Sequence, residues 1–163
     1  MSYETPLGFI YSDNGKVLMK APANISFCKI PNDVEQIDDY AFAYNKNLTE
    51  VVIPGNVKRI GPNAFTHCES LAKVSIEDGV AEIGEGAFAE CKQLKSLYIP
   101  ASVNFIGFGI AYKCSPELKL YCEVFKPHKK WTSRWNKLFA RLENWEASTT
   151  YGVPREWWDR FEN

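Results

Sequence analysis

Two adjacent residues, His67 and Cys68, are the best candidates for nucleophilic chemistry in this chain. A thiol beside an imidazole is the pair that cysteine hydrolases use, because the imidazole withdraws the thiol proton. Side chains of consecutive residues seldom point toward one another, however, and in a strand they point to opposite faces. The adjacency therefore argues against a catalytic dyad.

The cysteines also raise the question of a metal site. Cys68, Cys91 and Cys114 are spaced 23 residues apart, whereas a zinc ion needs its sulfur ligands to converge on one centre. The Asp38-Asp39 pair and the scattered glutamates fit no zinc-protease, calcium-loop or phosphate-binding motif. We expect structural thiols in a protein that is not an enzyme and has no cofactor and no bound metal.

The 23-residue interval extends through much of the chain. An Ala-Phe pair recurs at residues 41–42, 64–65 and 87–88, and residues 110–111 form a degraded copy. One such unit cannot bury its own apolar residues, but stacked units form a continuous core. Two further columns keep the same interval: Ile37, Ile60, Ile83 and Ile106, and Val34, Val57, Val80 and Val103.

Each unit contains one short strand pattern. The segments LTEVVIP, LAKVSIE and LKSLYIP alternate apolar and polar residues, as half-buried parallel strands do. Gly61, Gly84 and Gly107 follow the isoleucine column, where we expect a tight turn in which glycine tolerates a positive φ.

The consensus LxxVxIPxxVxxIGxxAFxxC resembles the BspA-type leucine-rich repeat of many bacterial and some protist proteins. The resemblance covers residues 25–122. It implies a curved solenoid with a parallel strand ladder on its concave side. It also implies that the array binds other macromolecules and catalyses no reaction.

The segments on either side of the repeats predict caps. Residues 8–19 read as two strands joined by Asn14-Gly15, which predicts a β-hairpin that covers the open edge of the first coil. After the repeats, the apolar residues at 131, 135, 138, 139, 142 and 145 have helical spacing, which predicts an amphipathic helix over about 130–146. Pro154 favours a short second helix after it, and residues 126–136 resemble the KPxxWxxxWN stretch that often closes such arrays.

The expected fold class is therefore an α/β repeat solenoid: a short leucine-rich-repeat array with a parallel strand ladder, an N-terminal β-hairpin cap and a C-terminal α-helical cap. We expect a single domain over residues 1–163. Its parts are the hairpin cap (1–24), the coils (25–122) and the helical cap (123–163).

Charge is unevenly distributed, although 19 basic residues nearly balance 20 acidic ones. Six basic residues and no acidic one lie between Val124 and Leu142. Such a patch either is the solvated face of the cap helix or binds an acidic protein, a nucleic acid or an anionic surface. The residues of this alternative site are Lys129, Lys130, Arg134, Lys137 and Arg141.

The preferred site is the side of the strand ladder that faces away from the core. Aromatic residues among mixed polar groups are typical of protein-recognition surfaces, so the hypothesis is a protein-protein interaction module without catalytic activity. A structural fragment of a bacterial surface protein is a further alternative. The predicted partner-binding residues are Phe27, Lys29, Glu50, Val52, Lys73, Ser75, Ser96, Tyr98, Lys119 and Tyr121.

Location and assembly are less determined. The apolar runs are too short to span a membrane, and no basic start precedes an apolar stretch at the N-terminus. This pattern predicts a cytoplasmic protein if Met1 is the native start, and the family resemblance gives a secreted or cell-surface protein as the alternative. The sequence indicates no oligomeric state.

Overall fold

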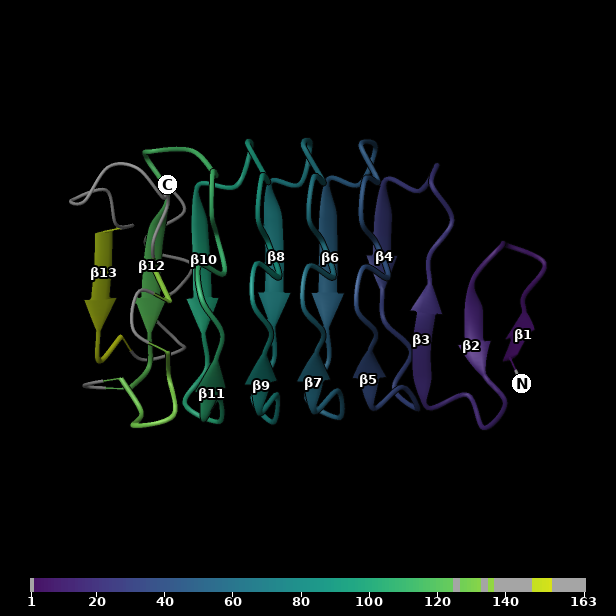
Figure 1. The fold of residues 1–163 in the computed structure, drawn as a ribbon, viewed down its shortest axis with the longest axis horizontal. Coiled ribbons are helices and arrows are strands. Elements are labelled where there is room, and N and C mark those ends of the chain that lie inside the picture. The colour runs from purple at the N-terminus through teal and green to yellow at the C-terminus, as the bar shows by residue number, and fades with distance from the viewer. Residues whose placement is uncertain (1, 125–126, 133–134, 137–147, 154–163) are drawn as a thin grey trace.

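The computed structural model describes residues 2–124, 127–132, 135–136 and 148–153. Within them the chain winds into a β-solenoid whose strands form two rows along the long axis (Figure 1). The front row contains β4 (Phe27–Lys29), β6 (Glu50–Ile53), β8 (Lys73–Ile76), β10 (Ser96–Ile99), β12 (Lys119–Cys122) and β13 (Ser148–Tyr151). The back row contains β3 (Val17–Lys20), β5 (Gln36–Ile37), β7 (Arg59–Ile60), β9 (Glu82–Ile83) and β11 (Phe105–Ile106), preceded by β1 (Ser2–Glu4) and β2 (Ile10–Ser12).

Strand pairing keeps the sequence period. Glu50 lies opposite Lys73 in the front row, and Ile37 lies opposite Ile60 in the back row, so each residue meets its counterpart 23 positions later. The front row consists of two parallel sheets, β4-β6-β8 and β10-β12-β13, and the back row is one sheet. The parallel ladder that the alternating segments predict is therefore present.

The third side of each coil, between the back strand and the next front strand, is built from turns. Alternate N–H groups here donate to the following coil: those of Tyr40, Phe42 and Tyr44 donate to the carbonyls of residues 62, 64 and 66 at 2.7–3.1 Å. The alternation requires left-handed residues, and φ is 57° at Tyr40 and 63° at Tyr44. A helix would direct these hydrogen bonds along the chain instead of between coils, because each helical N–H donates to the carbonyl four residues earlier.

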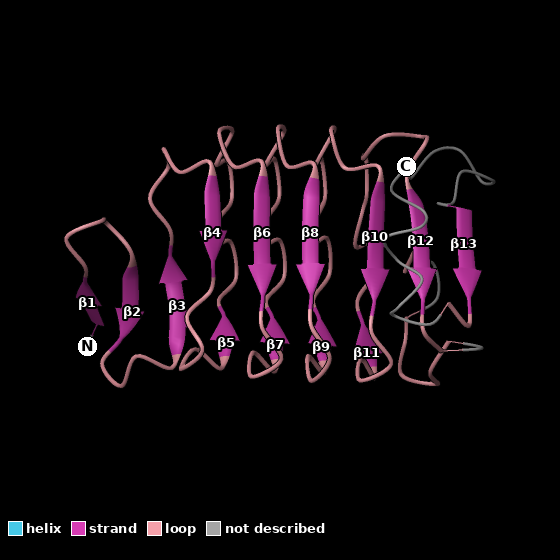
Figure 2. Ribbon diagram, turned by 180° about the vertical axis from the view of Figure 1, so that it is seen from behind, coloured by secondary structure: helices cyan, strands magenta, loops and turns pink. Residues whose placement is uncertain are grey.

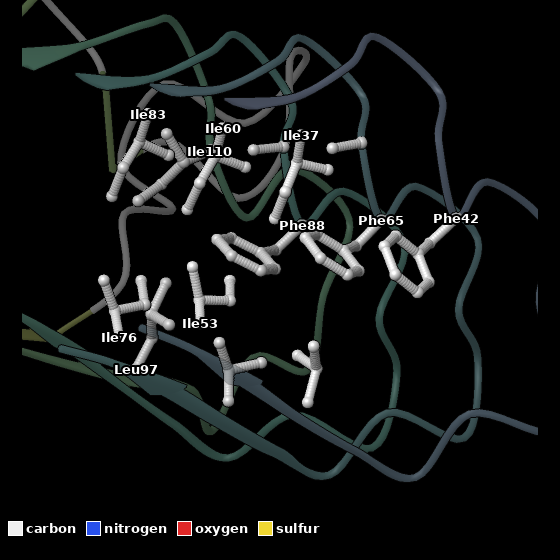
Figure 3. Close-up of a cluster of buried hydrophobic side chains, with 14 of the residues drawn as sticks. Ile37, Phe42, Ile53, Ile60, Phe65, Ile76, Ile83, Phe88, Leu97 and Ile110 are labelled. Carbon is white, nitrogen blue, oxygen red and sulfur yellow. The ribbon is translucent and has the colours of Figure 1, made fainter. Parts of the chain in front are cut away.

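The core consists of columns of identical side chains stacked along the axis. The rings of Phe42, Phe65 and Phe88 lie one above the other, with centroids 4.7 Å and 5.3 Å apart. Figure 3 shows these rings between the isoleucines of the back row and the residues of the front strands. All three rings are buried. The columns of repeated apolar residues predicted from the sequence therefore form the core.

The predicted C-terminal α-helical cap, and with it the α/β class, is wrong for the part of the chain that the structure describes. This part contains strands and loops but no helix (Figure 2). Trp131 and Trp135 lie in turns, and the Thr132 N–H donates to the Ile106 carbonyl at 2.9 Å, as Gly107 donates to Ile83 one coil earlier. The chain here continues the solenoid, and β13 pairs in parallel with β12.

The misreading has a specific cause. The four-residue spacing of Trp131 and Trp135 matches a helical face, but it also matches Ile106 and Ile110 in the preceding coil. Both tryptophans are buried, and the Trp131 indole N–H donates to the Val103 carbonyl at 3.3 Å. Residues 133–134 and 137–146 of the expected first helix, and the whole expected second helix, lie outside the described residues.

The role predicted for the repeat glycines is also wrong. Gly61, Gly84 and Gly107 do not have positive φ. Instead, a Cβ atom on Gly84 would lie 2.4 Å from the Pro62 nitrogen, and one on Gly107 would lie 2.4 Å from the Glu85 nitrogen. Successive coils approach so closely at this column that only a hydrogen atom fits between them.

The N-terminal hairpin predicted from Asn14-Gly15 is present, with β2 and β3 antiparallel and φ +72° at Gly15. β3 then pairs in parallel with β5. The hairpin thus covers the first edge of the back row only. We expected the hairpin to cover the open edge of the first coil, but it forms no strand pairing with β4.

The close approach at the glycine column gives a stability test. We expect Gly84→Ala to lower the free energy of unfolding by about 3 kcal/mol, because the added methyl group must displace backbone atoms of the preceding coil. Gly86→Ala is the matched control, since Gly86 has φ +58° and its added methyl group meets the Asn63 side chain, which can rotate. Its expected loss is about 1 kcal/mol. Urea unfolding measures both variants, and equal losses would contradict the close-approach explanation.

Candidate functional site

The chemistry-bearing pair at residues 67 and 68 does not form a dyad. Cys68 is buried, and its thiol donates to the Phe42 carbonyl at 3.2 Å. The His67 ring stacks on the Tyr44 ring at 4.6 Å, and its Nδ1 lies 3.5 Å from a Glu90 carboxylate oxygen. The thiol thus serves the core, while the imidazole belongs to a polar row on the turn side.

The repeat cysteines share one structural role, as their register predicts. Each thiol donates to a phenylalanine carbonyl of the preceding coil, Cys91 to Phe65 at 3.3 Å and Cys114 to Phe88 at 3.0 Å. Asn45 takes this position in the first copy and donates to the Pro22 carbonyl at 2.9 Å. The cysteine column therefore satisfies carbonyl groups that face the interior.

Burial also disfavours the thiolate form of four of the cysteines. It raises the pKa of Cys28, Cys68 and Cys122 to about 12, and that of Cys91 well above its ordinary value. Since the thiolate is both the nucleophile and the metal ligand, a thiol of this kind is a poor candidate for either role. Within the described residues, no group of three or more His, Cys, Asp or Glu side chains is placed to hold a metal ion.

The ten predicted partner-binding residues all lie on the front row and alternate with buried ones. We call the outward surface that they form the ladder face. Phe27 is 54% exposed, Lys29, Lys73 and Lys119 are exposed, and Val52 is half-buried. Glu50, Ser75 and Ser96 are half-buried as well. The inward residues between them, such as Val51, Val74 and Leu97, are buried.

Tyr98 and Tyr121 are the exception on the ladder face. They are only 4% and 5% exposed, their rings stack at 4.9 Å, and they form a small apolar cluster with Val153. The Val153 N–H donates to the Cys122 carbonyl at 3.1 Å, which holds this residue beside the strands. The accessible part of the ladder face is therefore its N-terminal half, around β4, β6 and β8.

The basic patch is described only in part. Lys129 and Lys130 are exposed, whereas Arg134, Lys137 and Arg141 lie outside the described residues. The predicted convergence of these charges on one helix face has no counterpart in the described segment, because residues 127–132 form a coil segment.

The structure also contains a groove that the sequence reading missed. It has a volume of 430 Å³ and lies at the N-terminal end, beside the first front strand. Leu7, on its rim, is 77% exposed. The only sequence signal for this groove is Leu7 itself, an apolar residue inside the turn segment TPLG. The groove is lined by Thr5, Pro6, Leu7, Phe9, Tyr11, Cys28, Lys29 and Pro31.

Burial of the tyrosine pair gives a second stability test. Tyr98→Ala with Tyr121→Ala removes two stacked rings, so we expect the free energy of unfolding to fall by more than about 3 kcal/mol. Tyr40→Ala is the control, because Tyr40 is 53% exposed, and we expect a change below about 1 kcal/mol. A double variant as stable as the wild type would place the two rings in solvent.

Thiol burial predicts resistance to alkylation. A thiol with a pKa near 12 is about 0.01% thiolate at pH 8, so iodoacetamide should leave Cys28, Cys68 and Cys122 of the native protein unmodified over an hour. In 8 M urea we expect all five cysteines to react. Intact-mass spectrometry counts the adducts, and rapid labelling of Cys68 in the native protein would contradict the described role of the column.

Comparison with known proteins agrees with this geometry. The family model described as "BspA type Leucine rich repeat region" matches residues 17–123 in six copies. No protein with a curated description matches the chain. No helix in the described residues is both long and apolar enough to cross a membrane.

Solved structures show the same fold at low sequence identity. A leucine-rich repeat protein from Bacteroides capillosus is 23% identical with a TM-score of 0.60, and the match covers 91% of this chain and 98% of that one. A leucine-rich cell surface protein from Faecalibacterium prausnitzii is 22% identical with a TM-score of 0.65, and the match covers 97% of this chain but 39% of that one. The pneumococcal vaccine antigen PcpA is 17% identical with a TM-score of 0.63, with 99% and 45% covered. This chain thus spans less than half of the last two proteins.

Proposed function

Because the chain belongs to the BspA-type leucine-rich-repeat family, we propose that it is a non-catalytic module that binds another protein through the N-terminal half of the ladder face. The observation that carries the proposal is the exposed Phe27 ring on a strand that is held by hydrogen bonds to β6. A large aromatic side chain in solvent on a rigid sheet is a typical anchor for a protein partner.

The surroundings of Phe27 suit such an interface. Val52, on the neighbouring strand, adds apolar area, and the Lys73 ammonium lies 3.5 Å from a Glu50 carboxylate oxygen at the border. An apolar centre with a charged rim is the usual anatomy of a protein interface. The paired strands lose little conformational entropy on binding, because their backbone is already ordered.

The absence of catalysis is part of the same proposal. The repeat family and the buried, carbonyl-bonded thiols support it. The match to a cell surface protein from Faecalibacterium prausnitzii is a likeness of fold, and a structural role in a larger surface protein is compatible with binding through the ladder face.

The test is an affinity capture from the native organism's lysate, treated with nuclease, using three versions of the protein. We expect the wild type to retain one protein that Phe27→Ser with Val52→Thr loses, with a weakening of at least tenfold, or about 1.4 kcal/mol. Both changes leave the core intact, so the melting temperature should stay within about 2 °C.

Tyr40→Ala is the matched control for this capture, since Tyr40 has nearly the same exposure as Phe27 but lies on the turn side. It should retain the partner. Retention by the Phe27/Val52 variant would contradict the proposed surface. Loss of the partner on nuclease treatment would transfer the function to the basic patch.

A further inference from the structure

The first front strand, β4, has one edge that pairs with no other strand in the described part of the chain. β4 pairs with β6 on one side, while the hairpin strand β3 pairs with β5 in the back row. Figure 1 shows β4 as the first member of the front row, while the hairpin strands β3 and β2 extend the back row beyond β5. An open strand edge is a template for another extended segment.

The orientation of the main-chain groups on β4 follows from its bonds to β6. The Glu50 N–H donates to the Ser26 carbonyl at 3.3 Å, and the Ile30 N–H donates to the Val52 carbonyl at 3.0 Å. Main-chain groups alternate sides along a strand, so those of Phe27 and Lys29 face away from β6. The described part of the chain supplies no hydrogen-bond partner for them.

The apolar groove of 430 Å³ adjoins this edge, since Cys28, Lys29 and Pro31 form one of its walls. Phe9 and Tyr11 of the hairpin contribute to its lining, and Leu7 stands exposed at the rim. The groove thus offers an apolar space beside main-chain donors and acceptors.

We propose that an extended segment of a partner protein adds to β4 as a parallel strand, with an aliphatic residue in the groove and an acidic residue beside Lys29. The aliphatic residue donates its N–H to the Phe27 carbonyl and accepts from the Lys29 N–H, as each coil does with the next. Since Phe27 and Lys29 belong to the ladder face, this inference rests on the proposed function and specifies the form of its partner.

The solenoid itself defines the aliphatic position. The inward column that begins at Cys28 continues in register as Val51 and Val74, and in the second front sheet Leu97 pairs in register with Leu120. A strand added before β4 places its corresponding residue over Cys28, where the groove provides the space. A polar side chain at this position would lose its hydration without gaining a compensating hydrogen bond, so the position requires an apolar side chain.

Charge complementarity defines the acidic position. Among the described residues, Lys29 is the only charged one that lines the groove, and no carboxylate of this part of the chain lies within ion-pair distance of it. Within the array, Glu50 and Lys73 on adjacent strands form an ion pair across the ladder. An acidic residue next to the aliphatic one gives Lys29 the corresponding partner.

The inference is tested with the full chain, labelled with ¹⁵N, and the acetylated, amidated peptide STLETS. We expect the amide signals of Phe27 and Lys29 to shift on titration. Replacing the peptide leucine by serine, or methylating its main-chain nitrogen, should weaken binding about tenfold or more, because each change removes the apolar contact or a ladder hydrogen bond.

A charge swap tests the role of Lys29. Lys29→Glu should bind STLETS several-fold more weakly than the wild type and should prefer the peptide STLKTS. Lys119→Glu is the matched control, because Lys119 is also an exposed lysine of the front row but lies on β12, away from the groove. This variant should keep the wild-type preference. Unchanged melting temperatures confirm that both variants are folded.

Three results would overturn the inference: equal affinity for all the peptides, no shift at Phe27 or Lys29, or a protein that self-associates with these two amides protected before peptide is added. The last result identifies a second copy of the chain as the occupant. If the Phe27/Val52 variant loses its captured partner while the peptides fail to bind, the proposed function stands and the edge inference falls. If the peptides bind as expected while that variant retains its partner, the ladder face beyond the edge is not the binding surface.

Discussion

The rest of the structure depends on hydrogen bonding between coils that are 23 residues apart. Both strand rows and the turn side direct main-chain groups along the solenoid axis, so each coil satisfies the polar groups of its neighbours. The left-handed residues on the turn side are a consequence, because only an alternating backbone presents every second N–H to the next coil. The same constraint leaves each end of a row with unpaired groups, which a cap, another coil or a partner must cover.

Side chains follow from this register. Identical residues stack because identical backbone positions stack, which produces the phenylalanine column of Figure 3 and the cysteines that donate to it. The columns are close-packed in different ways. The phenylalanine rings fill the centre of the coil, and the glycine column lets neighbouring backbones come into contact.

The same rigidity shapes the proposed binding surface. A strand ladder holds its outward side chains at fixed spacings, so Phe27, Val52 and the Glu50–Lys73 pair are presented together without ordering a loop. Toward the C-terminal end, the two stacked tyrosines pack with Val153 and are buried, so they are not part of the accessible surface. Toward the N-terminal end, the hairpin covers the back row and leaves β4 open, so accessible apolar area and unpaired main-chain groups occur at the same place.

The sequence by itself determined the period, the inward and outward positions of each strand and the buried role of Cys68, Cys91 and Cys114, because a repeat places every equivalent residue in the same environment. Where the repeat ends, residue spacing no longer has one meaning. Trp131 and Trp135 fit a helix or a further coil equally well, and only the hydrogen bonds from the preceding coil decided between them. Burial of Tyr98 and Tyr121 and the open edge of β4 were likewise decided by tertiary structure, because both depend on where the terminal segments pack against the array. A pattern confined to one strand carries no information about which distant segment covers it.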